Sequence, residues 1–114
     1  MSVDITIISG DDFHLDFLIL DENEEPVSDL LNATGLLQIR ATTLSDVVIA
    51  SANAVINSAE GSIQFTIPDT VTETFLADGD MRRSMVYGTK ITYADGTEET
   101  PVFGRLMVKR GVVR

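Results

Sequence analysis

Apolar and polar residues alternate with a period of two along most of this chain, which is the pattern of strands that bury one face. The alternation predicts strands over residues 3–7, 13–20, 36–41, 62–67 and 81–93. The end of the second stretch is apolar on both faces, so we expect it to be covered on both sides. Short strands at such spacings, with turn residues between them, indicate an antiparallel β-sandwich of about seven strands.

One segment, residues 69–78, is predicted to be helical. Asp69 or Thr70 can cap its start, and Glu73 follows Thr70 by three residues, as in a capping box. Gly79 can end it. The all-β fold is therefore expected to contain one short helical crossing near residues 69–78.

A hairpin is predicted at Asp95-Gly96, because Gly96 supplies the positive φ that a tight turn requires. The returning strand contains Pro101, which has no amide to donate and so fits an edge position or a bulge. The region 43–57 is less regular. Its β-branched residues favour one strand near 46–51, and we expect another near 53–57.

Charge is divided along the sequence. Residues 1–80 contain one cation, Arg40, against fifteen Asp and Glu, whereas residues 81–114 contain seven Lys and Arg against three acids. A folded unit with this division can present an acidic and a basic surface, which suits stacking against copies of itself or against a charged neighbour. The net charge of −10 argues against nucleic-acid binding, since affinity for phosphates grows with each Lys or Arg that neutralises one.

The 114 residues are enough for one domain, 1–114, and too few for a second core. No apolar run is long enough to span a bilayer, and residues 1–20 lack the basic start of a signal peptide. We therefore expect no membrane contact and a chain that stays in the compartment where it is synthesised.

Candidate chemistry is sparse. The chain has no cysteine, and its one histidine, His14, is predicted to lie on the wetter face of a strand in a structural role, with a pH-sensing role as the alternative. Residues 21–25 resemble a calcium loop only in charge, because the Gly and the closing Glu of an EF-hand are missing. They favour a solvated hairpin tip, with a weak cation site as the alternative, and Asp78-Gly79-Asp80 is interpreted in the same way. We expect no enzyme, no catalytic residue, no cofactor and no metal site.

A resemblance to a known family covers most of the chain. The sequence resembles the immunoglobulin-like domains found at the N-terminus of phage baseplate upper proteins and in short phage tail and head proteins. The segments that carry the resemblance are residues 10–17, 21–30, 33–40, 61–67, 90–97 and 104–108. The family often precedes a larger receptor-binding or fibre module, whereas this sequence ends at Arg114. The resemblance implies an immunoglobulin-like β-sandwich that serves as a virion structural protein, made in the host cytoplasm.

The function expected on these grounds is assembly by protein–protein contacts into the tail, baseplate or capsid, with copies of the chain and other virion proteins as partners and a homo-oligomer in the particle. The basic C-terminal end is hypothesised to dock on an acidic face of a second copy. The candidate contacts are Asp11, Asp12, Glu22, Glu24, Arg110, Val112, Val113 and Arg114. The alternative is a β-sandwich binding module whose loops, 21–26 and 43–58, recognise a host-surface carbohydrate or protein.

Overall fold

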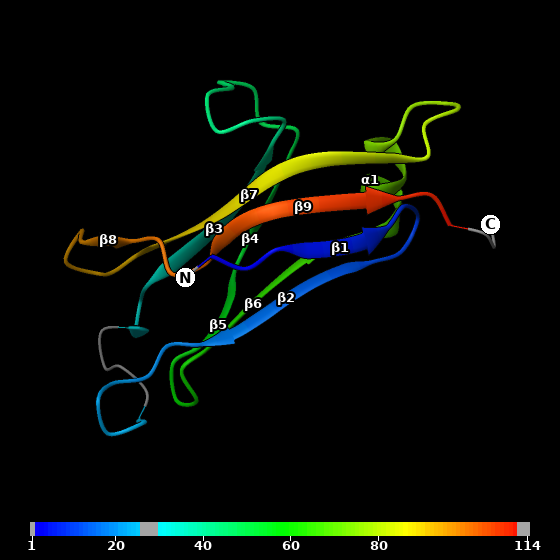
Figure 1. Ribbon diagram of the computed structural model, residues 1–114. Helices are drawn as coiled ribbons and strands as arrows, with labels where there is room; N and C mark the ends of the chain where they lie inside the picture. The colour runs from blue at the N-terminus through cyan, green and yellow to red at the C-terminus, as the bar shows by residue number, and fades with distance from the viewer. Residues whose placement is uncertain (1, 26–29, 112–114) are drawn as a thin grey trace.

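The strands of this chain form two sheets that face each other across an apolar core (Figure 1). The computed structural model describes residues 2–25 and 30–111. Within these ranges the larger sheet has the strand order β1-β9-β7-β3-β4, with β8 paired to β7, and the smaller sheet has the order β2-β6-β5. The strands are β1 (Ile5–Ile8), β2 (Phe13–Leu18), β3 (Thr34–Arg40), β4 (Ala50–Asn53), β5 (Val55–Asn57), β6 (Ser62–Ile67), β7 (Arg82–Thr92), β8 (Glu98–Glu99) and β9 (Phe103–Lys109).

Two short connections join the sheets, one at each side of the sandwich. The turn at residues 9–12 carries the chain from β1 in the larger sheet to β2 in the smaller one. On the other side the chain passes from β4 to β5 through Ala54, whose amide donates to the carbonyl of Gly35 at 2.9 Å. Gly35 is required there, because a Cβ would lie 2.6 Å from the Cβ of Ala54 and 3.0 Å from Cδ1 of Ile91.

The core consists of the inward-facing residues of both sheets, as the alternation predicts. Phe65 and Ile63 of β6 face Leu37 and Ile39 of β3, and all four are fully buried. Phe17 and Phe65 stack with ring centroids 6.2 Å apart. Burial of this apolar surface is the main force that holds the two sheets together.

The helical crossing is shorter than predicted. It consists of α1 (Asp69–Thr72) and a 3₁₀ turn (Glu73–Phe75), and it directs Thr72 and Phe75 into the core. The expected capping box does not form, because the N-cap position is Pro68 and Thr70 lies inside the helix. Instead the carboxylate of Asp12 accepts from the amide of Asp69 at 2.7 Å. No helix in the described residues is long and apolar enough to cross a membrane.

Strand positions follow the predictions closely except in the region 43–57. The expectation that the end of the second stretch is covered on both sides is wrong, since Leu18 and Leu20 are 59% and 39% exposed. The strand expected near 46–51 lies instead at Ala50–Asn53, and Val47 and Val48 belong to an exposed loop. Arg40 explains the difference, because its guanidinium donates to the carbonyl of Ser45 at 2.7 Å and ties the loop back on itself, and pairing with β3 resumes only where the Ile49 amide donates to the Ile39 carbonyl. The second expected strand is β5.

One pairing departs from an all-antiparallel sandwich: β1 runs parallel to β9. Because β1 continues into the other sheet, no hairpin dictates its direction relative to β9. The predicted hairpin forms at Gly96, where φ is +90°, and the interruption expected at Pro101 separates β8 from β9. There the amide of Thr89 donates to the carbonyl of Val102 at 3.0 Å, and the Thr89 hydroxyl donates to the same carbonyl and accepts from the Val102 amide.

Candidate functional site

The outer face of the larger sheet carries a regular grid of side chains where β3, β7 and β9 lie side by side. The register pairs Arg40 with Val86 and Val86 with Arg105, so these three residues form a row across the strands. The next row consists of Gln38, Gly88 and Phe103. Since neighbouring strands are separated by about 4.8 Å, the two arginines lie on either side of Val86, roughly 10 Å apart at the backbone.

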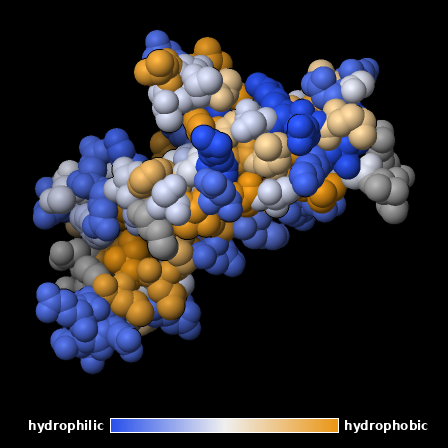
Figure 2. Space-filling model, in the orientation of Figure 1, coloured by the Kyte–Doolittle hydropathy of each residue, from blue (hydrophilic) through white to orange (hydrophobic). Residues whose placement is uncertain are grey.

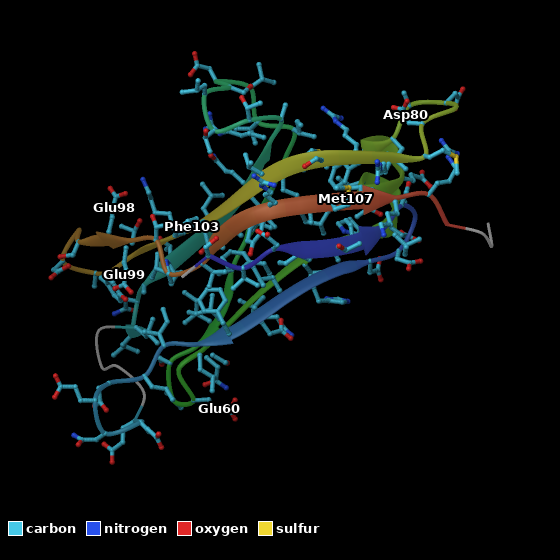
Figure 3. All side chains as sticks on the ribbon, in the orientation of Figure 1. Glu60, Asp80, Glu98, Glu99, Phe103 and Met107 are labelled. Atoms are coloured by element: carbon cyan, nitrogen blue, oxygen red, sulfur yellow. The ribbon has the colours of Figure 1, made fainter. Side chains whose placement is uncertain are left out.

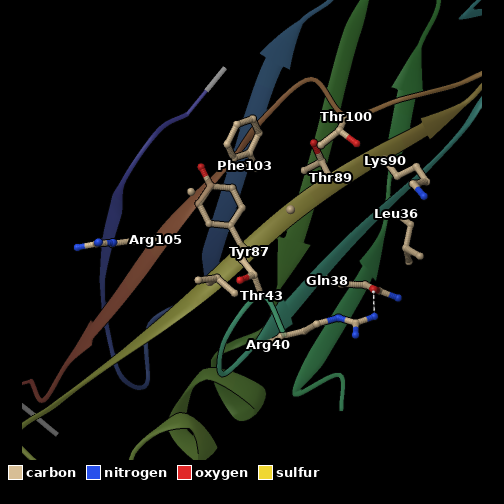
Figure 4. A pocket seen from close by; sticks show the side chains of 13 residues that line it. Leu36, Gln38, Arg40, Thr43, Tyr87, Thr89, Lys90, Thr100, Phe103 and Arg105 are labelled. Carbon is tan, nitrogen blue, oxygen red and sulfur yellow. Dashed lines mark hydrogen bonds between the residues drawn. The ribbon is translucent and has the colours of Figure 1, made fainter. Parts of the chain in front are cut away.

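Gly88 leaves the centre of this grid empty. A Cβ at this position would meet nothing within 4 Å, whereas its neighbours in the row carry the side chains of Gln38 and Phe103. The result is a hollow of about 560 Å³ (Figure 4). We call it the outer groove, and its lining residues are Leu36, Gln38, Arg40, Thr43, Val86, Tyr87, Gly88, Thr89, Lys90, Thr100, Phe103, Gly104 and Arg105.

The outer groove combines exposed apolar side chains with a positive rim. Phe103 and Leu36 are 45% and 36% exposed, which is high for side chains of their size. All charged residues that line the groove are cations: Arg40, Lys90 and Arg105. In a chain with a net charge of −10, this is a local reversal of sign.

The three cations of the rim differ in whether a carboxylate of the chain pairs with them. Arg40 donates to the side-chain oxygen of Gln38 at 2.9 Å and to the Ser45 carbonyl, which are both uncharged acceptors. Lys90 forms an ion pair with Glu98 at 3.0 Å, in which both side chains are more than half exposed. Arg105 is exposed, and its guanidinium has no hydrogen bond or ion pair to any described residue. The carboxylate of nearby Asp4 instead accepts from the Arg105 backbone amide.

The loop 41–49 adds apolar surface beside the outer groove, since Thr43 lines the groove and the loop continues from it. Leu44 and Val47 are 92% and 69% exposed. Figure 2 shows apolar atoms at the tip of this loop, which projects at the top of the view. Exposed apolar side chains that lie together mark surfaces that contact other molecules.

Acidic residues gather at one end of the molecule. The strand register brings the turns at residues 21–25, 58–61 and 93–97 to the same end, where Figure 3 labels Glu60, Glu98 and Glu99. We call this the acidic end, and its carboxylates belong to Asp21, Glu22, Glu24, Glu25, Glu60, Asp95, Glu98 and Glu99. This end draws acids from both parts of the sequence, since Asp95, Glu98 and Glu99 belong to residues 81–114, and the opposite end has charges of both signs.

The four acids predicted to form one acidic face, Asp11, Asp12, Glu22 and Glu24, do not lie together. Asp11 and Asp12 precede β2, whereas Glu22 and Glu24 follow it, so the strand holds the two pairs at opposite ends. Arg110 lies at the same end as Asp11 and Asp12 and donates to the carbonyls of Asp80 at 2.6 Å and Ala77 at 2.9 Å. The remaining predicted contacts, Val112, Val113 and Arg114, lie outside the described residues.

Three titratable side chains, those of His14, Tyr87 and Asp95, make contacts within the fold. His14 is exposed, as predicted, and its Nδ1 lies 3.2 Å from the Thr66 hydroxyl. Desolvation, with a smaller contribution from Asp4, raises the pKa of the Tyr87 phenol, which donates to the Val3 carbonyl at 2.5 Å. The Thr97 amide lowers the pKa of the Asp95 carboxyl in the hairpin turn.

Residues 21–25 form a turn that one of their own carboxylates stabilises. Oδ1 of Asp21 accepts from the amides of Asn23 and Glu25, at 2.8 and 3.1 Å, which closes the loop on itself. No cluster of three or more His, Cys, Asp or Glu suited to a metal ion occurs in the described ranges. The geometry of this turn is that of a compact acidic projection.

Comparison with known proteins identifies the fold. No protein-family model and no curated protein matches the chain. Among solved structures, the chain is similar to the periplasmic chaperone SfaE, with a TM-score of 0.52 and 12% identity over 97% of this chain and 56% of that one. It thus spans little more than half the length of SfaE.

The extracellular domain of the voltage-gated sodium channel β4 subunit is a second neighbour, with a TM-score of 0.50 and 8% identity over 97% of this chain and 93% of that one. The extracellular domains of that protein form parallel homodimers that explain its role in cell–cell adhesion. A likeness to murine CRIg is weaker, with a TM-score of 0.42 and 10% identity over 95% of this chain and 92% of that one. This chain has an immunoglobulin-like fold. Identities this low show the fold alone, and the predicted immunoglobulin-like sandwich with its short helical crossing is confirmed.

The outer groove was not predicted from the sequence. One feature of the sequence does point to the groove: Gly88 is a lone glycine inside a strand that otherwise alternates regularly. Such a glycine often marks a place where another backbone or a ligand approaches the strand closely. The sequence does not show, however, which residues of β3 and β9 stand beside it, because register between distant strands is set by the whole fold.

Proposed function

We propose that this chain is a non-enzymatic structural protein of a phage virion, which assembles with copies of itself and with other virion proteins. The observation that carries the proposal is the outer groove with the adjoining apolar loop, a surface suited to contact with another protein. The sequence resemblance to immunoglobulin-like domains of phage tail and head proteins supports the virion setting.

Two features support a binding role rather than catalysis. The two groups with shifted pKa values, Tyr87 and Asp95, each have a structural partner and lie apart, so they form no acid–base pair. The groove itself contains no carboxylate and no histidine among its lining residues. Its chemistry suits the docking of an anionic and partly apolar surface.

The test is recovery of the chain with intact particles. Particles are purified from a lysate of the phage that encodes it, and the amount of the chain per particle is measured by quantitative mass spectrometry. A fixed number of copies per particle, retained through a density gradient and through washing at high salt, is the expected result. Recovery only in the soluble fraction would contradict the proposal.

The loop 41–49 favours a second candidate, a binding module for a host-surface protein, because Leu44 is almost fully exposed. In that case replacing Leu44 and Val47 by Ser should abolish adsorption of the particle to host cells while the chain remains in the particle. Loss of the chain from the particle in the same variant would favour the structural role.

A further inference from the structure

We propose that copies of this chain associate head to tail, with the acidic turn 21–25 of one copy seated in the outer groove of the next. This inference rests on the self-association that the proposed function includes, and it names the two surfaces.

The positive charge of the groove favours an acidic binding partner. Arg40, Lys90 and Arg105 lie around an apolar floor, and no carboxylate lines the groove. The charges of Arg40 and Arg105 are not paired with a carboxylate among the described residues. An anionic surface that reached the groove would gain charge-assisted hydrogen bonds with them.

The turn 21–25 has the required shape and charge. Its backbone is closed by bonds from Asp21 N to the Glu25 carbonyl at 2.7 Å and from Glu24 N to the Asp21 carbonyl at 3.1 Å. The carboxylate of Asp21 is used within the turn, which leaves Glu22 and Glu24 to face solvent. A loop that is already ordered loses little conformational entropy when it binds.

Apolar surface accompanies the charge on both sides of the proposed contact. Leu18 and Leu20 precede the turn and are 59% and 39% exposed. Phe103 and Leu36 are the matching exposed side chains in the groove. Contact between these pairs would remove apolar area from water, which the charges alone do not achieve.

Charge also excludes a symmetrical dimer through the groove. Two copies that met groove to groove would bring Arg40 and Arg105, which have no carboxylate partner among the described residues, against the same two cations of the other copy, and close juxtaposition of like charges is costly. A contact between two different surfaces does not have this penalty. It is heterologous, so it repeats from copy to copy and closes into a ring or continues as a filament.

The sandwich prevents the turn from reaching its own groove. The turn follows β2 in the smaller sheet, whereas the groove opens on the face of the larger sheet that points away from the smaller one (Figure 1). The two surfaces can therefore meet only between copies.

The test is charge reversal on both surfaces, read by sedimentation velocity over a range of protein and salt concentrations. Glu22→Lys and Arg105→Glu should each weaken the association constant about tenfold or more at low salt, and the double variant should recover most of the loss. Asp78→Lys and Lys109→Glu change the net charge equally at exposed positions outside both surfaces, and they should leave association unchanged. Added salt should weaken the wild-type contact.

A disulfide trap provides a second measurement, because the natural chain has no cysteine. Glu22→Cys in one preparation and Gly88→Cys in another should form a mixed disulfide when they are combined under mild oxidation. The control pair, Glu22→Cys and Lys109→Cys, should form no mixed disulfide under the same conditions, because Lys109 lies outside the groove.

The outcomes separate the two proposals. Association that is equally strong in all variants, with no preferred disulfide, would overturn the head-to-tail contact and leave the virion role intact, provided that the chain is still recovered with particles. A wild-type chain that stays monomeric at all concentrations would also overturn it. Absence of the chain from particles would overturn the proposed function, whichever way the variants associate.

Discussion

Two glycines on the larger sheet show how a single hydrogen in place of a side chain serves opposite purposes. Gly104 of β9 lies directly beneath the backbone of Val3, so a Cβ there would lie well inside contact distance of the Val3 carbonyl. Gly88 of β7 borders open space. One glycine lets the first residues of the chain pack closely, and the other makes the groove.

Replacing Gly104 by Ala is expected to lower the free energy of unfolding by about 1–3 kcal/mol, because a backbone carbonyl cannot move aside as a side chain can. Gly88→Ala is the matched control, and its effect should stay within about 0.5 kcal/mol. Urea denaturation of both variants measures the difference. Equal effects would show that the close approach at Val3 has no energetic consequence.

Tyr87 gives a second prediction at the same scale. Tyr87→Phe should destabilise the fold by about 1 kcal/mol at neutral pH, because the Val3 carbonyl loses its donor. The pKa of Tyr87 is raised in the folded state, so the unfolded chain releases the phenolic proton first as pH rises. The stability that Tyr87 contributes is therefore complete below a pH of about 10 and is lost as pH rises through the folded-state pKa.

The advantage of wild type over Tyr87→Phe should accordingly stay constant up to a pH of about 10 and shrink above it, since the variant has no phenol to titrate. Denaturation curves of both proteins at several alkaline pH values measure this gap. A gap that is constant over the range would contradict the assignment.

At the scale of elements, Thr72 joins the helical crossing to the connection between β1 and β2. Its side chain is fully buried, donates to the Asp11 carbonyl at 2.7 Å and accepts from the Gly10 amide at 3.1 Å. The turn at residues 9–12 and α1 are therefore held as one unit, far apart though they are in sequence.

Thr72→Val keeps the shape of the side chain and removes both hydrogen bonds, so we expect a loss of about 1–3 kcal/mol in the free energy of unfolding. Thr70→Val, at an exposed position of the same helix, should change stability by less than about 0.5 kcal/mol. Thermal unfolding followed by circular dichroism compares the two. An effect of Thr72→Val no larger than that of Thr70→Val would show that the junction is not fixed by this hydroxyl.

The strands were predictable where local pattern and burial agree, as in Ser62–Ile67 and in the hairpin around Gly96. The strand near 46–51 was misplaced, because the apolar character of Val47 and Val48 favours a strand while Arg40 holds their loop outside the sheet. The helix is shorter than its capping pattern suggests, since Asp12, more than fifty residues away, supplies the carboxylate at its start. Contacts between distant residues decided both cases, and a single sequence does not display them.

At the scale of the whole molecule, the surface is divided by charge into an acidic end and a groove with a cationic rim. The acidic end collects carboxylates from three turns, and the described residues contain one ion pair, between Lys90 and Glu98. The division of charge was visible in the sequence. The groove was not, because it arises only when Arg40, Gly88 and Arg105 are brought together by the register of three strands.

Repulsion at the acidic end should limit stability at low ionic strength. Glu60→Lys is therefore expected to raise the free energy of unfolding by a few tenths of a kcal/mol at about 10 mM salt, with the gain vanishing near 0.5 M as the charges are screened. Melting temperatures at both salt concentrations measure the effect. Asp78→Lys, at the mixed end, is the control and should gain less.

The two short connections between the sheets, through residues 9–12 on one side and Ala54 on the other, bear on how the two sheets can separate. Because both sides are closed by covalent crossovers of only a few residues, neither sheet can peel away from its partner laterally. Solvent is therefore expected to enter the interior from the end that α1 and the 3₁₀ turn do not cover, and the amides nearest that end should exchange their hydrogens before those midway along Ser62–Ile67 do.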